Sequence, residues 1–550
     1  MAIQYHKLRL AGWIPLFSMA AMLMIFAYLV GRTALFFGAP YAWYDKIAAA
    51  MLLLAEIFIL VHGFGYFLNI YHVAKASRDA GTALQPSDLR ALETFPPVAI
   101  IVSSYKEPIE VVRDTLICFY NLTYPNKRIY FLDDTRYDLA WDTPERMQAY
   151  RNDIDALCQE IGVHLFRRKW HGAKAGMIND FLDFIEGNQR EGFELRAYGP
   201  KRGSEKETYI IVFDADMNPF PDFVEPLVAW MEENPRLAFI QTPQYYSNFE
   251  HNRVARAAGL QQAVFYEYIC EGKSLQDAMF CCGTNVIFRR EALMSVGGFD
   301  ESSVTEDFAT SLKFHQAGWS SRYLNKVCAF GLGPEDLGGY FKQQFRWALG
   351  TVGLFRTILR NFFRNPGMLP AMKWWEYLLS GSHYFIGWVF LVMIYCPVLY
   401  LFGNVPSYFA RPEIYLLLFA PYMVLSMGVF IATLAQRKYR LGELLQGILL
   451  NAICFPVFMR ASLLGILGVR GTFGITPKGQ SQALPLSGIW PQVLSAVACF
   501  SAIIWGLHRL YYEREPMNAI WVNMLWCLYH FTILSTVFYF NDPQESKGGS

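Results

Sequence analysis

Six runs of apolar residues, each long enough to cross a bilayer, constrain this 550-residue chain more than any other feature. They cover residues 11–30, 47–70, 377–402, 414–434, 491–507 and 519–540. Charged residues make up only 17% of the chain, whereas soluble proteins average about 25%. Residues 71–370, between the second and third runs, read instead as a soluble domain. The sequence therefore predicts a membrane protein with six transmembrane helices and one large domain outside the bilayer.

A seventh apolar stretch, residues 441–469, differs from the six because it contains Glu443, Asn451, Pro456 and Arg460. Polar groups that face lipid are costly, so we expect one or two helices that lie at the membrane interface or re-enter it. A complete span is the alternative.

Basic residues near the ends of the runs predict the orientation. Most of them fit an N-terminus and a soluble domain on the cytosolic side of the plasma membrane. The residues that fit are Lys7, Arg9, Lys75, Arg78, Arg437, Lys438 and Arg440, whereas Arg509 and Arg514 do not. We divide the chain into helices (1–75), a soluble domain (76–350), an interfacial helix (351–376), helices (377–434), interfacial or re-entrant helices (435–470), a loop (471–480), helices (488–540) and a tail (541–550).

The soluble domain alternates short apolar runs with helical patterns, as in "PPVAIIVSSYKE", "RIYFLDD" and "TYIIVFDADM". This alternation predicts a parallel sheet flanked by helices, with ligands bound beyond the carboxyl ends of the strands. The absence of a G-x-G-x-x-G or Walker sequence argues against a kinase, ATPase or dehydrogenase. The net charge of +1 gives no reason to expect nucleic acid, and the ten cysteines form no C-x-x-C pair, which favours a reducing compartment.

The strongest chemical motif is "FDADM", in which Asp214 and Asp216 follow a buried strand. Two adjacent carboxylates repel each other and lose solvation, and a divalent cation such as Mg²⁺ or Mn²⁺ relieves both costs. The cation then bridges to a nucleotide diphosphate. A solvated loop is the alternative.

Other strand ends carry weaker motifs. In "LDD", Asp133 and Asp134 either accept hydrogen bonds from a base or ribose, or cap a turn. In "SSYKE", Tyr105 can stack on a base beside Ser104 and Glu107. In "HGAKAG", Lys174 stands among small residues that let a phosphate approach. An ordinary solvated loop is the alternative for the last two.

Two further motifs precede or lie within helical patterns. In "TED", Asp307 next to Glu306 is either a general base or a helix cap. In "QQFRW", Gln343 can bond a sugar hydroxyl, Arg346 a diphosphate, and Trp347 can stack on a sugar ring. An interfacial aromatic anchor is the alternative for the second motif. "GTFGITPKG" predicts a mobile loop with Phe473, Thr476 and Lys478 as its working side chains, or an ordinary turn.

Taken together and in order, "LDD", "KAGMIN", "DAD", "QTPQYY", "FCCGTN", "TED", "QQFRW" and "FGITPKG" resemble the processive, membrane-embedded family 2 glycosyltransferases, most closely the cellulose synthase catalytic subunit and its curdlan-synthase relatives. The resemblance implies a cytosolic, Rossmann-like family A (GT-A) domain that inverts the anomeric centre of a UDP-sugar and passes a nascent polysaccharide across the bilayer. By this resemblance, accessory envelope proteins are plausible partners.

The resemblance also assigns roles to residues. UDP is held by Ser104, Tyr105, Glu107, Asp133, Asp134 and Lys174, and by Asp214 and Asp216 through Mg²⁺. Asp307 is the base beside Glu306, while Gln343, Arg346 and Trp347 shape the site. Cys282 and Gly283 border the acceptor, and Phe473, Thr476 and Lys478 belong to a gating loop.

Departures from the family pattern leave the product open. The six spans, "LDDT" and Ile475 differ from most cellulose synthases, and no cyclic di-GMP-sensing barrel follows residue 540, so direct control by that nucleotide is not expected. We expect a 1,3- or 1,4-linked β-glucan from UDP-glucose. The alternatives are a chitin- or hyaluronan-type synthase that uses UDP-N-acetylglucosamine, a non-processive transferase that decorates a lipid, and a transporter. Trp374, Trp375 and Tyr377 follow the site and either line a sugar path or form an interfacial belt.

Overall fold

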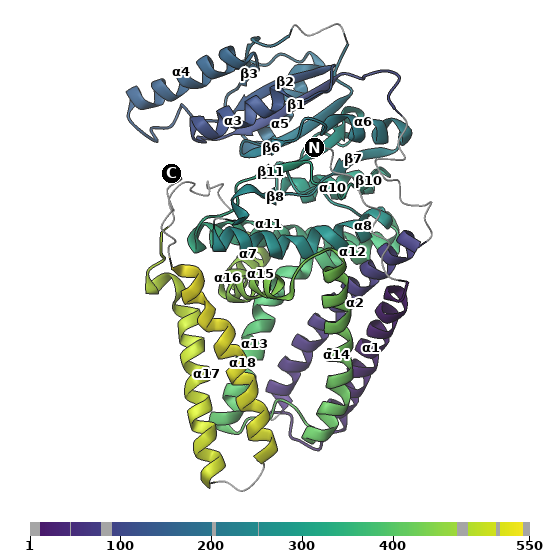
Figure 1. Ribbon diagram of the computed structural model, residues 1–550, viewed down its shortest axis with the longest axis vertical. Coiled ribbons are helices and arrows are strands. Elements are labelled where there is room, and N and C mark those ends of the chain that lie inside the picture. Colours follow the sequence, from purple (N-terminus) through teal and green to yellow (C-terminus); the bar gives the residue numbers. More distant parts are fainter. Residues whose placement is uncertain are drawn as a thin grey trace.

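The structure is a computed structural model that describes residues 12–44, 46–78, 91–200, 205–250, 252–469, 482–512 and 517–542. Three layers stack along its long axis (Figure 1). A sheet domain lies at one end and a bundle of long helices at the other. Between them lies a layer of helices that run across the long axis, among them α11 (Leu337–Arg364), α15 (Leu441–Ile453) and α16 (Phe455–Leu467).

In the described part of the chain, six helices are long and apolar enough to cross a membrane, the number that the sequence predicts. Their apolar side chains remain exposed because lipid, rather than protein, surrounds a spanning helix. The helices are α1 (Ile14–Gly38), α2 (Lys46–Arg78), α12 (Ala371–Ser382) joined through η5 (His383–Phe385) to α13 (Ile386–Gly403), α14 (Pro412–Gln436), α17 (Leu486–Tyr512) and α18 (Met517–Asn541).

The stretch 441–469 forms two helices, α15 and α16, bent by 50° at Cys454. Pro456 stands in the first turn of α16, where its missing N–H breaks no helical hydrogen bond. Such a pair is either a broken span or a re-entrant segment, so the interfacial or re-entrant placement of these helices stays a prediction. Figure 1 shows both of them beneath α11, on the side of the long helices.

The sheet domain is built on eight strands in the order β10-β7-β9-β5-β1-β2-β3-β4. The predicted strands β1, β2, β3 and β5 pair in parallel, whereas β9 and β4 run antiparallel to their neighbours. The strand bounds are β1 (Val98–Ser104), β2 (Lys127–Asp133), β3 (His164–Arg167), β4 (Glu194–Arg196), β5 (Tyr209–Asp214), β7 (Leu237–Gln241), β9 (Val286–Arg289) and β10 (Ser320–Tyr323). A second, three-stranded sheet joins β6 (Met217–Pro219), β11 (Ala329–Gly331) and β8 (Tyr245–Tyr246).

Helices cover both faces of the large sheet, which explains its continuous apolar strands. Alternate residues of β1 enter two different cores: Val98 and Ile100 pack in one, Ala99 and Ile101 in the other. The helices of this domain are α3 (Ile109–Tyr120), α4 (Pro144–Ile161), α5 (Ala173–Glu186), α6 (Val224–Glu233), α9 (Arg290–Ser295) and α10 (Glu306–Gln316). A continuous rod of α7 (Arg253–Val264), a π-helical turn η3 (Phe265–Cys270) and α8 (Glu271–Leu275) lies toward the long helices.

Buried ion pairs join the sheet domain to the membrane helices. Lys273 at the end of the rod pairs with Glu376 of α12, and both side chains are buried. At the end of α14, Arg437 bonds Glu271 (Nη2–Oε2, 2.7 Å) and lies 3.3 Å from Glu267. Breaking such a pair leaves an uncompensated buried charge, so these contacts hold the two parts in one arrangement.

The predicted domain boundary at residue 350 differs from the structure, because α11 runs without interruption from Leu337 to Arg364. Asp336 caps its start by accepting a hydrogen bond from the N–H of Gly339 (2.6 Å), and the helix ends two residues before Pro366. Nothing at residue 350 can stop a helix. Gly350 instead lets α11 pack closely, since a Cβ there would lie 2.5 Å from Cγ2 of Thr305.

Candidate active site

Polar residues at three strand ends meet at one edge of the sheet. In the strand register, Ser104 of β1 stands beside Asp133 of β2, and Ser103 stands beside Asp214 of β5. The parallel strands therefore place the "SSYKE", "LDD" and "DAD" motifs next to one another, as the topology requires.

Lys174 lies at the centre of this edge. Its ammonium forms an ion pair with Asp214 and donates a hydrogen bond to the carbonyl of Gly283 (2.8 Å). Burial opposes its charge, but Asp214 and Glu306 raise the pKa of Lys174 above its ordinary value. The Asp214 side chain remains 44% exposed, so one side of this charged cluster is open to a ligand.

Asp307 belongs to the first turn of α10 and faces the same cluster. Burial and the neighbouring Glu306 carboxylate raise the pKa of Asp307 to about 7. Its Oδ1 accepts a hydrogen bond from the N–H of Phe308 (2.8 Å), while Thr305, not Asp307, occupies the N-cap position. A Cβ at residue 283, which has φ +85°, would lie 2.9 Å from Oδ2 of Asp307. The carboxylate thus lies directly against the backbone of Gly283.

A buried amide that the sequence reasoning did not select organises this region. The Gln241 side chain, at the end of β7, donates to the carbonyls of Thr242 and Thr284 (2.8 Å each) and accepts from the N–H of Cys282 (2.8 Å). It therefore fixes the turn that presents Gly283 to Lys174 and Asp307. The "QTPQYY" motif contained this residue, but only its burial in the fold reveals the role.

The "QQFRW" motif lies in the N-terminal half of α11 and beside the carboxylates. The positive charge of Arg346 acts to lower the pKa of Glu306, although burial raises that pKa overall. Oε1 of Gln343 is buried and accepts no hydrogen bond from the described residues. The Trp347 ring is half-buried. A buried acceptor without a donor is costly, which suits a site completed by a ligand hydroxyl.

The predicted uridine-binding residues are largely engaged by the protein itself. Asp133 accepts from Nε of Arg167 (2.7 Å), the Tyr137 hydroxyl (3.0 Å) and the N–H of Thr135 (3.2 Å). Asp134 lies 3.1 Å from Arg168, and burial raises the pKa of Asp134 to about 7.

On the other strand end, Tyr105 is half-buried, and the Lys106 ammonium lies 4.9 Å from the centre of its ring. The carbonyl of Glu107 accepts from the Tyr150 hydroxyl (2.9 Å). The backbone at Lys106 has φ +57°, which turns the chain sharply after β1.

The acidic residues fit a cation that also binds phosphate. No group of three His, Cys, Asp or Glu side chains suited to a metal occurs among the described residues. Asp214 and the half-buried Asp216 supply two carboxylates, and Mg²⁺ commonly takes one or two carboxylates together with substrate phosphates and water.

Two other predictions concern the surroundings. Phe473, Thr476 and Lys478, the predicted gating-loop residues, lie outside the described residues. Trp374 and Tyr377 do not line a path, because both are buried: Nε1 of Trp374 donates to the Pro366 carbonyl (2.8 Å), and the Tyr377 ring stacks on Phe308.

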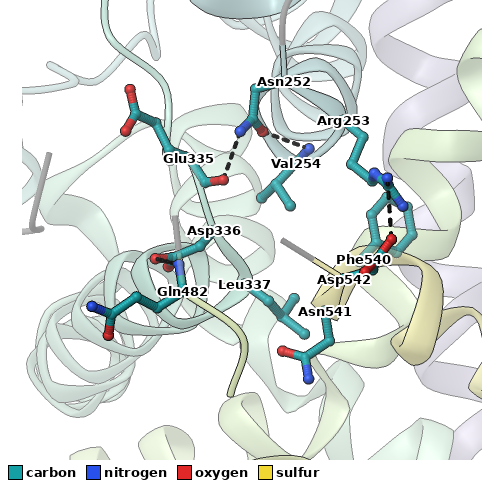
Figure 2. A pocket seen from close by; sticks show the side chains of 10 residues that line it. All are labelled: Asn252, Arg253, Val254, Glu335, Asp336, Leu337, Gln482, Phe540, Asn541 and Asp542. Atoms are coloured by element: carbon teal, nitrogen blue, oxygen red, sulfur yellow. Dashed lines mark hydrogen bonds and ion pairs between the residues drawn. The ribbon is translucent and has the colours of Figure 1, made fainter. Parts of the chain in front are cut away.

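A small pocket lies near the start of α11, and Asp214, Glu306 and Asp307 do not line it. Figure 2 shows Asn252 donating to the carbonyl of Glu335 (2.7 Å) on one side, with Arg253, Phe540 and Asp542 on the other. Its volume of about 10 Å³ suffices for about one water molecule, so it is no sugar site.

Comparison with known proteins accounts for this arrangement. Residues 99–297 match the family "Glycosyl transferase family 2", and residues 209–432 match "Glycosyl transferase family group 2". A solved structure, "Mannosyltransferase PcManGT from Pyrobaculum calidifontis in complex with GDP-Man and Mn2+", aligns with 76% of this chain and 100% of its own, with 16% identity and a TM-score of 0.47.

Curated relatives are more extensive matches. "Cellulose synthase catalytic subunit [UDP-forming]" of Pseudomonas fluorescens is 27% identical over 90% of this chain and 62% of its own length. "Cellulose synthase 2" of Novacetimonas hansenii is 27% identical over 78% of this chain and 25% of its own length. The chain thus spans less than two thirds of either relative. Both findings confirm the resemblance that the motifs indicated: residues 99–432 match models of family 2 glycosyltransferases, and most of the chain resembles cellulose synthase catalytic subunits, with a GT-A domain attached to helices long and apolar enough to span a membrane.

Proposed function

We propose that this protein polymerises glucose from UDP-glucose into a β-glucan and passes the polymer across the plasma membrane, with its GT-A domain in the cytosol. The observation that carries the proposal is the cluster at Gly283, beside α11: Lys174 bonds its carbonyl and pairs with Asp214, and Asp307 lies against its backbone. A base, an ammonium ion and a partly exposed carboxylate at one sheet edge suit the transfer of an activated sugar. The proposal leaves the linkage as 1,3 or 1,4.

The nucleotide lies, in this proposal, beyond the ends of β1, β2 and β5. Tyr105 stacks on the base, and the carboxylates of Asp133 and Asp134, beside Ser104 and Glu107, hold the uridine. Lys174 and Arg346 neutralise the diphosphate, because both carry permanent or strongly held positive charge. When bound to Asp214 and Asp216, Mg²⁺ or Mn²⁺ supplies further charge for the departing diphosphate.

The reaction is an in-line displacement at the anomeric carbon. The hydroxyl oxygen of the acceptor sugar forms a bond to C1 while the bond from C1 to the diphosphate oxygen breaks, and UDP leaves with that electron pair. Asp307 takes the proton of the hydroxyl, helped by Glu306, which keeps its pKa high. Attack opposite the leaving group inverts the configuration.

The acceptor chain end lies, in this proposal, between the "FCCGTN" turn and α11. Cys282 and Gly283 border it on one side, and the ring of Trp347 stacks on the sugar. Oε1 of Gln343 accepts a hydrogen bond from a sugar hydroxyl. Because α11 lies against the layer of α15 and α16, the growing end stays close to the membrane helices (Figure 1).

The test uses full-length enzyme in nanodiscs with UDP-glucose and Mg²⁺. We expect glucanase-sensitive polymer from the wild type, none from Asp307→Asn, and unchanged UDP binding in that variant. Asp300→Asn is the matched control. Asp300 precedes α10 and pairs with Lys313 of that helix, and its replacement is expected to leave synthesis intact. Loss of UDP binding in Asp307→Asn would contradict its role as the base.

A panel of donors tests the substrate class. Polymer formed from UDP-N-acetylglucosamine but not UDP-glucose would place the protein with chitin- or hyaluronan-type synthases. Short products linked to lipid would identify a non-processive transferase. Linkage analysis of the product then decides between 1,3 and 1,4 bonds.

A further inference from the structure

The C-terminal two turns of α11 extend beyond the helix that covers the preceding turns. Helices α11 and α16 run side by side in the same direction, as three contacts show. Arg460 lies over the ring of Phe345 (5.4 Å), a Cβ at Gly465 would lie 3.0 Å from Cβ of Val352, and one at Gly468 would lie 2.4 Å from Nη1 of Arg356. Because α16 ends at Leu467, residues 357–364 of α11 have no partner from α16.

The face left uncovered is basic with one large aromatic side chain. Arg360 and Phe363 follow Arg356 by about one and two helical turns and so continue the face that α16 covers earlier, and Arg364 stands beside them. The three arginines are exposed, and Phe363 is 76% exposed. None of the three arginines forms an ion pair with another described residue, and no acidic residue occurs between Asp336 and Glu376.

This face points toward the bilayer side of the molecule. Figure 1 shows α16 between α11 and the long helices, and the uncovered face continues the one that α16 contacts. At its edge, α16 exposes Leu463 (46%), Ile466 (46%) and Leu467 (67%), as expected of side chains that meet lipid. The opposite side of α11 is already occupied, since Phe362 packs against Trp374 of α12.

We propose that residues 356–364 of α11 form a binding surface for the phosphate headgroups of anionic lipids. Arg356, Arg360 and Arg364 bond the phosphates, while Phe363 inserts among the upper acyl chains. Arginine and aromatic side chains at the level of the headgroups are the arrangement that membranes favour. These guanidinium groups can take an anionic ligand, because none of them forms an ion pair with an acidic side chain among the described residues.

The proposal does not depend on the proposed function, since α11 and α16 and the spanning helices define the surface without a substrate. It does give α11 two partners. Its N-terminal half carries "QQFRW" beside the carboxylates, and its last two turns lie on lipid. The composition of the bilayer then influences the helix that shapes the candidate active site.

The test counts lipids on purified full-length protein. Nanodiscs of phosphatidylcholine and phosphatidylglycerol in equal parts are analysed by native mass spectrometry, and the retained lipids of each kind are compared. We expect the wild type to retain phosphatidylglycerol preferentially. Each arginine removed weakens that preference about fivefold, so Arg360→Gln/Arg364→Gln loses most of it.

Two control variants keep the result interpretable. Arg360→Lys/Arg364→Lys retains both charges and should retain most of the preference, which shows that the glutamine variant has not simply misfolded. Arg146→Gln removes an exposed arginine of α4, far along the sheet domain, and should behave as wild type. Equal retention of phosphatidylglycerol by the wild type and the glutamine variant would overturn the proposal. So would loss of self-association in the glutamine variant with lipid retention unchanged, because the face would then bind protein.

Discussion

The raised pKa of Asp307 makes a direct prediction about the pH dependence of synthesis. A base works only when deprotonated, and burial together with Glu306 raises the pKa of Asp307 to about 7. The rate at saturating donor should therefore fall as the pH drops below 7. At pH 6 about one Asp307 in ten remains ionised, so the rate should be roughly tenfold below its plateau.

Glu306→Gln tests the cause of this shift. Removing the neighbouring negative charge makes the Asp307 carboxylate less costly and lowers its pKa, so the acidic limb of the profile should move to lower pH. The variant should then retain a larger share of its own plateau rate at pH 6 than the wild type does, even if the plateau itself is lower.

The assay quantifies UDP released in quenched reactions from pH 5.5 to 8.5, with product mass as a second measure. UDP binding is measured by calorimetry at each pH. It distinguishes a fall in rate caused by protonation of Asp307 from one caused by weaker binding of the nucleotide. A wild-type rate that stays level between pH 6 and 8 would refute the assignment of a pKa near 7 to the base. A limb that moves to higher pH in Glu306→Gln would refute the electrostatic reasoning.

Further variants test three other parts of the structure. Gln241→Leu removes the hydrogen bonds of this side chain to Thr242, Thr284 and Cys282, and should lower kcat strongly with UDP affinity retained, whereas equal loss of both would point to misfolding. Asp214→Asn and Asp216→Asn should each raise the Mg²⁺ concentration needed for half-maximal synthesis, and metal dependence identical to wild type would contradict the proposed cation site. Lys273→Met leaves the buried Glu376 carboxylate unpaired and should destabilise the protein by about 3–5 kcal/mol, seen as a lower Tm in detergent, while adding Glu376→Leu should restore most of the loss.

The sequence predicted the parts of the fold that depend on local pattern. The parallel strands β1, β2 and β5 end in polar residues, and their meeting at one edge follows from parallel pairing alone. The direction in which a strand pairs, by contrast, is not visible in its local residue pattern. The run "VIFR" of β9 is as apolar as its neighbours, yet it pairs antiparallel with β5, so its place in the sheet could not be read from its residues.

The candidate site shows the same division between local and long-range information. The Lys174–Asp214 pair joins two predicted motifs 40 positions apart, but that they contact each other is a result of the fold. Gln241 was overlooked because a glutamine after an apolar run resembles any loop residue. For Trp374 and Tyr377 the sequence left a sugar path and an interfacial belt open, because aromatic side chains suit both places, and only the fold shows that they pack in a core against Phe362 and Phe308.

The ion pairs between the rod and the membrane helices constrain how this protein can be assembled. The ribosome delivers Glu271 and Lys273 about a hundred residues or more before Glu376 and Arg437, their partners. Until the later helices enter the bilayer, the underside of the nascent GT-A domain carries charged groups that have nothing to neutralise them. We therefore expect the sheet domain, when excised without its helices, to be less stable than in the full chain and more prone to precipitate.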